Sequence, residues 1–197
     1  MKELTLKEIQ NLLGYEVKII ADKPSRTLAD VPVGETFKVG DFEFVVLEHT
    51  DDGTNVILKD FWKTNTFDSD TSNYAKSKIR KELNSDFYKK LIALVGKQNV
   101  IEHIVDLTTD DGRKDYGSVN DNISLLTCDM YRKYVDILDK YNPNKWWWLA
   151  TSWSTAAKGW GYAVRCVGSG GTLSRNNCDL NDGVRPFCRL VSSISVF

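Results

Sequence analysis

The side chains best suited to acid–base or nucleophilic chemistry near neutral pH are two histidines and four cysteines. His49 and His103 stand in no recognisable nucleophile motif, and their spacing gives no evidence of a histidine–cysteine pair. We expect each histidine to be a surface residue of a strand or helix. No C-x-x-C pair is present among Cys128, Cys166, Cys178 and Cys188, so zinc is not indicated. A disulfide among Cys166, Cys178 and Cys188 would require neighbouring strands, and buried free thiols are favoured.

Glycine-rich and acidic stretches give no firmer catalytic signal. The run Gly168–Gly171 lacks the lysine-serine or lysine-threonine pair of a phosphate-binding loop, and a hairpin turn explains it. The acidic loop 110–115 lacks the ligand register of an EF-hand. Asp179 and Asp182 are either paired carboxylates or side chains that cap turns. The sequence therefore predicts neither a metal site nor a cofactor.

Residues suited to binding are concentrated near the C-terminus. Five of the six tryptophans fall between Trp146 and Trp160, and a polar region follows them. Tryptophan and tyrosine supply large rigid contact areas, whereas serine, asparagine, aspartate and arginine supply adaptable hydrogen bonds. Residues 153–182 have this mixture. We predict that they form a ligand-binding surface.

The bulk composition is that of a folded chain without a global charge. Its 197 residues suffice for one well-buried domain, alone or with a small N-terminal attachment. The 26 basic and 27 acidic residues leave a formal charge of −1, so no charge excess attracts nucleic acid. The chain has neither a membrane-spanning apolar run nor the layout of a secretory signal. We expect synthesis in the cytoplasm, without a signal peptide and without membrane insertion.

The N-terminal third predicts a helix followed by strands. Thr5-Leu6-Lys7-Glu8 is a capping box, and apolar residues follow at helical spacing as far as Gly14. This apolar stripe must pack on the domain or on another copy of the chain, and packing on the domain is favoured. A strand is predicted at 15–20, and a β-hairpin with one core-facing side at 42–58.

Helices are predicted in the middle of the chain. Apolar residues recur every four positions from Ile79 to Leu91, which indicates a helix with one buried face. Asn84-Ser85-Asp86 favours its division into two helices, because short polar side chains compete for backbone hydrogen bonds. A strand is predicted at 100–107, and Thr127 is the expected N-cap of a further helix.

The C-terminal part predicts an antiparallel meander, so the expected fold class is α+β. Three adjacent tryptophans in one strand cannot all face one side, and we assign Trp148 to the core and expect Trp160 to be exposed. The predicted strands lie at 146–149, 162–167, 172–174 and 184–191.

Several of these segments resemble one protein family. The chain is similar to C-type lectin-like domains of the formylglycine-generating-enzyme type, and more narrowly to the variable proteins of phage and prokaryotic diversity-generating retroelements. The resemblance extends from about residue 30 to the C-terminus. It is carried by Trp147-Trp148-Leu149-Ala150-Thr151-Ser152, Val164-Arg165-Cys166-Val167, Gly171-Thr172-Leu173, Gly183-Val184-Arg185-Pro186-Phe187 and, upstream, by Val33–Phe37, Ser77–Asn84 and Ile123–Leu126.

The resemblance implies a C-type lectin-like fold over residues 31–197, with antiparallel sheets and two or more flanking helices. Residues 1–30 would form an N-terminal helix and strand that dock or oligomerise. A retroelement would diversify a ligand-binding variable region at about 146–190. The side chains expected to contact the ligand are Lys158, Trp160, Tyr162, Ser174, Arg175, Asn176, Asn177, Asp179, Asn181 and Asp182.

The implied function is non-catalytic binding of a protein or glycan ligand on a target cell surface. Virion association and a homo-oligomeric state are further expectations. No calcium–sugar motif of animal lectins is present. The alternative is a formylglycine-generating-type oxidase that uses Cys166, Cys178 or Cys188, although the catalytic cysteine pair of those enzymes has no assignable match.

Overall fold

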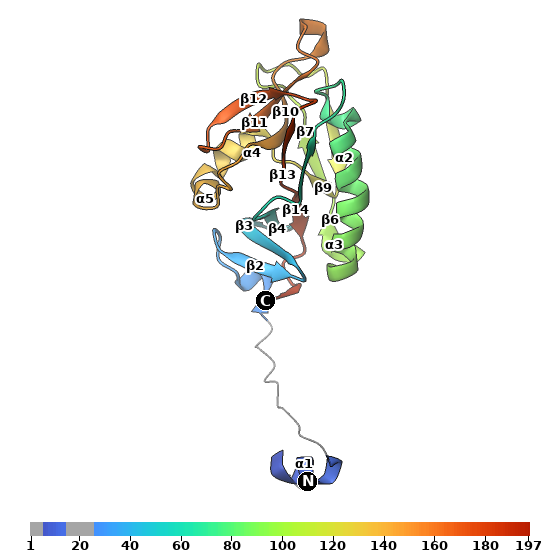
Figure 1. Cartoon of the computed structure of the whole chain (residues 1–197), viewed down its shortest axis with the longest axis vertical. Helices are drawn as coiled ribbons and strands as arrows, with labels where there is room; N and C mark the ends of the chain where they lie inside the picture. Colours follow the sequence, from blue (N-terminus) through green and yellow to red (C-terminus); the bar gives the residue numbers. More distant parts are fainter. Residues whose placement is uncertain (1–5, 15–25) are drawn as a thin grey trace.

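Residues 6–14 and 26–197 are described by the computed structural model, which has a mixed α+β architecture with several antiparallel sheets (Figure 1). The α-helices are α1 (Leu6–Leu13), α2 (Lys78–Glu82), α3 (Tyr88–Val95), α4 (Cys128–Lys133) and α5 (Val135–Lys140). Short 3-10 turns are η1 (Leu28–Asp30), η2 (Tyr74–Lys76), η4 (Lys97–Asn99) and η5 (Ala156–Lys158), and η3 (Leu83–Phe87) is a π-helix.

The strands of the described ranges pair into two large sheets and two small ones. One large sheet has the order β2-β3-β4-β14-β6, with β9 also on β14, and the other has the order β12-β11-β10-β13-β5. The small sheets are β1-β15 and β7-β8. The strands are β1 (Arg26–Thr27), β2 (Thr36–Val39), β3 (Phe42–Thr50), β4 (Gly53–Leu58), β5 (Lys63–Thr66), β6 (Val100–Ile101), β7 (His103–Asp106), β8 (Ser118–Asp121), β9 (Ile123–Ser124), β10 (Trp147–Ser152), β11 (Ala163–Val167), β12 (Leu173–Asn177), β13 (Asn181–Val184), β14 (Phe187–Leu190) and β15 (Ser195–Val196).

The hairpin predicted at 42–58 is confirmed as β3 and β4, but both faces of β4 are buried rather than one. The prediction of one continuous strand at 184–191 is wrong. It is divided between β13 and β14, which belong to different sheets. Pro186 lies at the division, and its missing N–H cannot continue a ladder. The chain therefore crosses from one large sheet to the other at Arg185-Pro186.

A parallel pairing corrects the expected antiparallel meander. β13 lies parallel to β10, with Trp147 opposite Gly183, and its other neighbour is β5 from the first half of the chain. One edge strand of the sheet that contains the tryptophan run is therefore β5, which precedes α2–α5 in the chain. A meander built from local hairpins has no place for such a partner.

Gly183 is required by its packing against Phe61, because a Cβ atom there would lie 2.3 Å from the ring of Phe61. We expect Gly183→Ala to lower the free energy of unfolding by about 1–3 kcal/mol through overpacking. Chemical denaturation measures this change. Gly170→Ala is the matched control, since a Cβ atom at Gly170 meets nothing within 4 Å. Equal stability of the two variants would contradict the close packing at Gly183.

The helix between Ile79 and Leu91 is continuous, so its predicted division at residues 84–86 is wrong. The five-residue π-helix Leu83–Phe87 joins α2 to α3. A π-turn holds more residues than the 3.6 of an α-turn and keeps a four-residue repeat on one face. The Asn84 amide donates to the Ile123 carbonyl at 2.8 Å, and its oxygen accepts from the Ile123 N–H at 3.1 Å. The predicted buried face is confirmed, because the side chains with 0% exposure are Ile79, Leu83, Phe87 and Leu91.

Two other predicted elements are subdivided. The strand expected at 100–107 is divided between β6, which pairs with β14, and β7, which pairs with β8. The N-cap at Thr127 is confirmed, because its hydroxyl accepts from the Met130 N–H at 3.2 Å. The helix that follows is interrupted at Tyr134, whose hydroxyl donates to Glu48 at 2.6 Å.

Two hydrophobic clusters lie on opposite sides of β10, because successive strand residues face opposite ways. Trp148, fully buried as predicted, contacts Phe67 edge to face on the side of α2 and α3. Trp147 is also buried and contacts Tyr131 on the side of α4 and α5. Figure 1 shows these two helix pairs on opposite sides of the strands. Trp146 remains 41% exposed.

Two leucines at the end of the N-terminal helix α1 are exposed, Leu12 at 73% and Leu13 at 48%. Packing of this stripe, on the domain or on another copy of the chain, stays a prediction. Thr5 of the capping box and the strand expected at 15–20 lie outside the described residues. None of the helices in the described ranges has both the length and the apolar character of a membrane span.

Candidate ligand-binding surface

Two adjacent strands and the loop before them position a group of exposed and half-buried aromatic and basic residues. In the β11–β12 hairpin, Arg165 lies opposite Arg175 and Ala163 opposite Asn177. The loop from 153 to 162 is fixed by its main chain. The Trp153 N–H donates to the Ala163 carbonyl at 2.9 Å, and the Trp160 N–H donates to the Thr155 carbonyl at 3.1 Å. This loop and η5 form one end of the molecule, at the top of Figure 1.

Five side chains on these elements contact one another, and we call them the arginine–aromatic cluster: Trp153, Trp160, Tyr162, Arg165 and Arg175. The Arg175 guanidinium carbon is 5.1 Å from the Trp153 ring centroid and 4.8 Å from that of Trp160. Arg165 lies 5.1 Å from the Trp153 ring. Tyr162 is tilted against Trp160 with centroids 6.2 Å apart. The cluster is thus held together by cation–π and aromatic contacts.

The cluster has an unbalanced charge. Arg165 and Arg175 are direct cross-strand neighbours, an arrangement that is destabilising for like charges. Arg165 is compensated by Asp110, with its Nε 3.5 Å from Oδ2, and Asp110 also pairs with Arg132 at 2.8 Å. No carboxylate in the described ranges lies within 4.0 Å of the Arg175 guanidinium nitrogens. Arg175 therefore presents an uncompensated positive charge.

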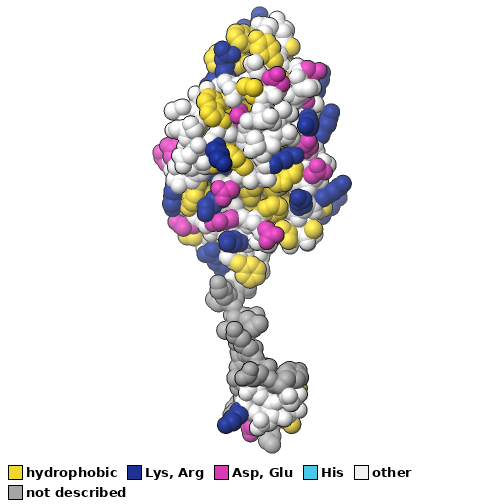
Figure 2. All heavy atoms as spheres, in the orientation of Figure 1, with side chains coloured by type: hydrophobic (Ala, Val, Ile, Leu, Met, Phe, Trp, Pro, Cys, Tyr) yellow, Lys and Arg dark blue, Asp and Glu magenta, His cyan; other side chains and the backbone are white. Residues whose placement is uncertain are grey.

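A cavity of about 360 Å³ adjoins the cluster through Asp110, which lines the cavity and pairs with Arg165. Its lining combines carboxylates with the hydroxyls of Thr108 and Thr127. Figure 2 shows hydrophobic and basic side chains together at the end of the molecule that carries the loop before β11. The other residues that line the cavity are Ile104, Asp106, Thr109, Gly112, Cys128, Asp129, Met130 and Thr151.

The predicted ligand-contacting residues differ in how far their side chains are exposed. Trp160, predicted to be exposed, is half-buried, as are Ser174 and Asn176. Asp182 is only 6% exposed and accepts a hydrogen bond from Asn176 at 2.8 Å. Burial raises the pKa of Asp182. Asp182 therefore lies outside the exposed surface, whereas the exposed members are Lys158, Tyr162, Arg175, Asn177, Asp179 and Asn181.

Sequence reasoning missed four residues of this region, Trp153, Arg165, Asp110 and Arg132. Trp153 and Arg165 fall within the predicted surface 153–182 but not among the predicted contact residues. With Gly168–Gly171 as the turn, counting back along both strands places Ser174 opposite Arg165, one residue away from its observed partner Arg175. Asp110 and Arg132 come from distant loop and helix positions, and no local pattern connects them to the hairpin.

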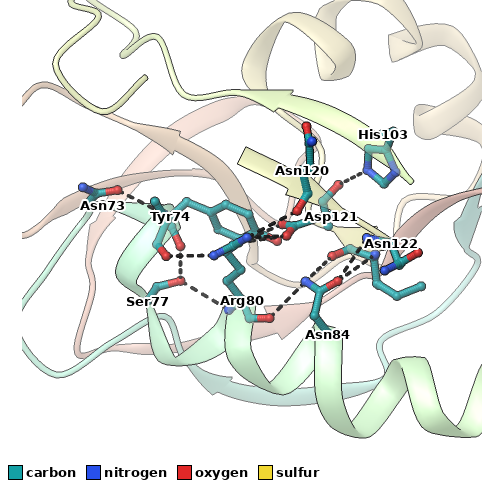
Figure 3. Close-up of polar contacts among 12 residues, drawn as sticks. Asn73, Tyr74, Ser77, Arg80, Asn84, His103, Asn120, Asp121 and Asn122 are labelled. Carbon is teal, nitrogen blue, oxygen red and sulfur yellow. Dashed lines mark hydrogen bonds and ion pairs between the residues drawn. The ribbon is translucent and has the colours of Figure 1, made fainter. Parts of the chain in front are cut away.

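A buried polar network, separate from the cluster, supports the α2–α3 helix (Figure 3). Arg80 on α2 pairs with Asp121 on β8 at 2.7 Å and donates to the Ala75 carbonyl at 3.0 Å. Burial raises the pKa of Asp121 even though the Arg80 guanidinium opposes that shift. Because Asp121 is only 3% exposed, the network connects elements rather than presenting a group to solvent.

A second buried polar contact, between His103 and Ser124, corrects one histidine prediction. His103 is 8% exposed rather than on the surface, and its Nε2 lies 2.9 Å from the Ser124 hydroxyl. Burial, with a smaller effect from Arg189, lowers the pKa of His103 to about 4. Phe187 packs edge-on against the imidazole with centroids 5.1 Å apart. Neither His103 nor Ser124 lines the cavity beside Asp110. His49 stays at the strand surface, as predicted.

All four cysteines are free and buried, as predicted. Burial raises the pKa of Cys166 to about 12 and that of Cys178 to about 11. It also raises the pKa of Cys188. The nucleophilic thiolate form is therefore disfavoured at all three positions near neutral pH.

No protein-family model matches the chain, and no curated protein or solved structure matches it either. A proposal of function therefore rests on the geometry of the arginine–aromatic cluster.

Proposed function

We propose that the chain is a non-catalytic binding protein that recognises a ligand on a target cell surface through the arginine–aromatic cluster. The observation that carries this proposal is the uncompensated charge of Arg175 against two tryptophan rings on an exposed face. Tryptophan, tyrosine and arginine are the residues most enriched at binding hot spots. Their position on a main-chain-fixed hairpin and loop gives a preorganised surface.

We further propose a C-type lectin-like fold and a variable protein of a diversity-generating retroelement. This proposal is supported by a difference in exposure between two sets of residues: those that match scaffold positions of the family and those that match its variable, or display, positions. Trp148, Gly183 and Arg185, which resemble scaffold positions, are buried, whereas Lys158 and Arg175 among the display positions are exposed. A neighbouring reverse transcriptase gene and a near-copy of the 3′ coding segment that differs at adenines are expected in the genome. Genomic sequence without both features would contradict the retroelement proposal.

Binding is proposed in preference to a formylglycine-generating-type oxidase because of the thiols. Such an oxidase would need a reactive thiolate at Cys166, Cys178 or Cys188, and all three side chains are at most 1% exposed. Copper-dependent turnover of a cysteine-containing peptide, lost on Cys→Ser substitution, would reverse this preference.

The double variant Trp160→Ala/Tyr162→Ala tests the proposed function. Labelled full-length protein is titrated on a panel of intact bacterial cells by flow cytometry. We expect the variant to bind at least about thirtyfold more weakly, because aromatic hot spots contribute about 2 kcal/mol or more. We expect its unfolding free energy to fall by less than about 1 kcal/mol, since Tyr162 is exposed and Trp160 only half-buried.

Trp146→Ala is the matched control, because this tryptophan is also exposed but lies outside the cluster. It should bind cells like the parent protein. A parent chain that binds no cell in the panel, or a double variant that binds as well as the parent, would contradict the proposed function. A fall in stability of about 3–5 kcal/mol would show instead that the two rings belong to the core.

A further inference from the structure

The guanidinium of Arg175 is held by ring faces and not by acids. Trp153 and Trp160 both lie within 5.1 Å of its central carbon. A guanidinium that is packed against aromatic faces still offers the N–H donors in its own plane, and their fork matches a carboxylate in two parallel hydrogen bonds. In the described part of the chain, no side-chain oxygen makes a hydrogen bond or ion pair with Arg175. The N–H donors of the Arg175 guanidinium are therefore available to bind an oxyanion of a ligand.

The surroundings of Arg175 favour an anion further. Arg165 stands directly opposite on β11, and its one carboxylate partner, Asp110, is shared with Arg132. Lys158 is exposed on the loop that carries Trp160. An incoming negative charge would relieve the repulsion between the two cross-strand arginines.

An exposed aromatic ring lies next to this cation. Tyr162 is 46% exposed and touches Trp160, which in turn touches Arg175. A sugar ring presents an apolar C–H face that packs on such a ring, and hydroxyls that point outward. The combination of a ring platform with a neighbouring carboxylate-binding fork suits a sugar that carries a carboxylate.

The adjoining cavity distinguishes a glycan from an acidic peptide. Its volume of about 360 Å³ is within the range of small-ligand pockets. Three carboxylates, Asp106, Asp110 and Asp129, line it together with threonine hydroxyls and one cation, Arg132, so its net charge is negative and it offers acceptors for hydroxyl donors. A peptide rich in carboxylates would meet repulsion there, whereas the neutral hydroxyls of a glycan would find partners.

We infer that the ligand is an acidic glycan, in which Arg175 binds the carboxylate of a uronic or sialic acid and Tyr162 packs on the sugar ring. This inference rests on the proposed function and specifies its ligand class. Neighbouring sugars of the glycan would extend toward the cavity beside Asp110, where their hydroxyls donate hydrogen bonds.

The test uses the full chain on an array of sialylated, galacturonate and glucuronate oligosaccharides. Each is paired with its carboxyl methyl ester, and polyglutamate is included as an acidic peptide. We expect binding to at least one free carboxylate form and at least about tenfold weaker binding to its ester. Arg175→Gln should abolish this preference, and Arg175→Lys should lose most of it because lysine lacks the planar fork. Arg26→Gln, an exposed arginine on β1, is the matched control and should behave like the parent.

The outcomes separate this inference from the proposed function. Cell binding that depends on Trp160 and Tyr162, without binding to any carboxylated sugar, would overturn the ligand class and leave the function standing. Equal affinity for acid and ester, or tighter binding to polyglutamate, would also overturn it. Thermal melts of the two Arg175 variants establish that each is folded, and a carboxylate preference that survives in both folded variants would remove Arg175 from the site.

Discussion

Replacing Arg80 with methionine is expected to lower the free energy of unfolding by about 3–5 kcal/mol at pH 7. Asp121 accepts from this guanidinium at 2.7 Å, and its side chain is only 2% exposed. Methionine keeps much of the packing volume but leaves the carboxylate buried without its counter-charge. Such a loss is larger than the energy of the ion pair itself, because the remaining charge stays desolvated. Urea denaturation at pH 7 measures the change.

The same variant should partly recover in acid. Burial already raises the pKa of Asp121, and removing the Arg80 charge raises that pKa further. The folded state then takes up a proton at a higher pH than the unfolded state, so the deficit is largest at neutral pH and shrinks as the pH falls. The double variant Arg80→Met/Asp121→Asn should regain much of the loss at pH 7. Additive losses in the double variant would show that the two side chains are not coupled.

Acidification from pH 7 to pH 4 is expected to remove up to about 3 kcal/mol of stability through His103 alone. Burial lowers the pKa of this imidazole to about 4 from an ordinary value of 6.5. Between these two values the unfolded chain binds a proton that the folded chain does not, so the unfolded state gains as the pH falls. The decline begins near the unfolded value and continues through the folded one.

His103→Gln isolates this contribution, since glutamine keeps a hydrogen-bonding group near Ser124 but does not titrate. The unfolding free energies of the parent and the variant are measured at several pH values, and the difference between them removes the effect of other titrating groups. We expect that difference to narrow as the pH falls from 6.5 to 4. A constant difference would mean that His103 has an ordinary pKa in the folded protein.

The sequence predicts those elements best whose signal is local. The β3–β4 hairpin combines turn residues with apolar strands, and the Thr127 N-cap depends on one neighbouring turn. The separation of β13 from β14, and the pairing of β13 with β5, depend on contacts between distant segments. The π-helix at Leu83–Phe87 likewise depends on Asn84 meeting the backbone of β9. No periodicity contains that information.

The candidate site likewise combines residues that the sequence identifies with residues that come from distant segments of the chain. The resemblance implied that Arg175 and Tyr162 contact a ligand, and both side chains are exposed. The predicted turn at Gly168–Gly171 places Ser174, not Arg175, opposite Arg165. The burial of Asp182 was not expected, because it results from the neighbouring β5 strand, which lies more than one hundred residues earlier. The shared partner Asp110 is likewise supplied by a loop with no local relation to the hairpin.

The loop from 153 to 162 and the β11–β12 hairpin are held mainly by main-chain hydrogen bonds, including that from the Cys178 N–H to the Tyr162 carbonyl at 2.8 Å. Such bonds are the same for almost any residue type. Mutational tolerance is therefore high at Lys158, Tyr162, Arg175 and Asn177, where the side chains are exposed. We expect a library randomised at these four positions to yield mostly folded proteins, which would make the molecule a scaffold for directed evolution.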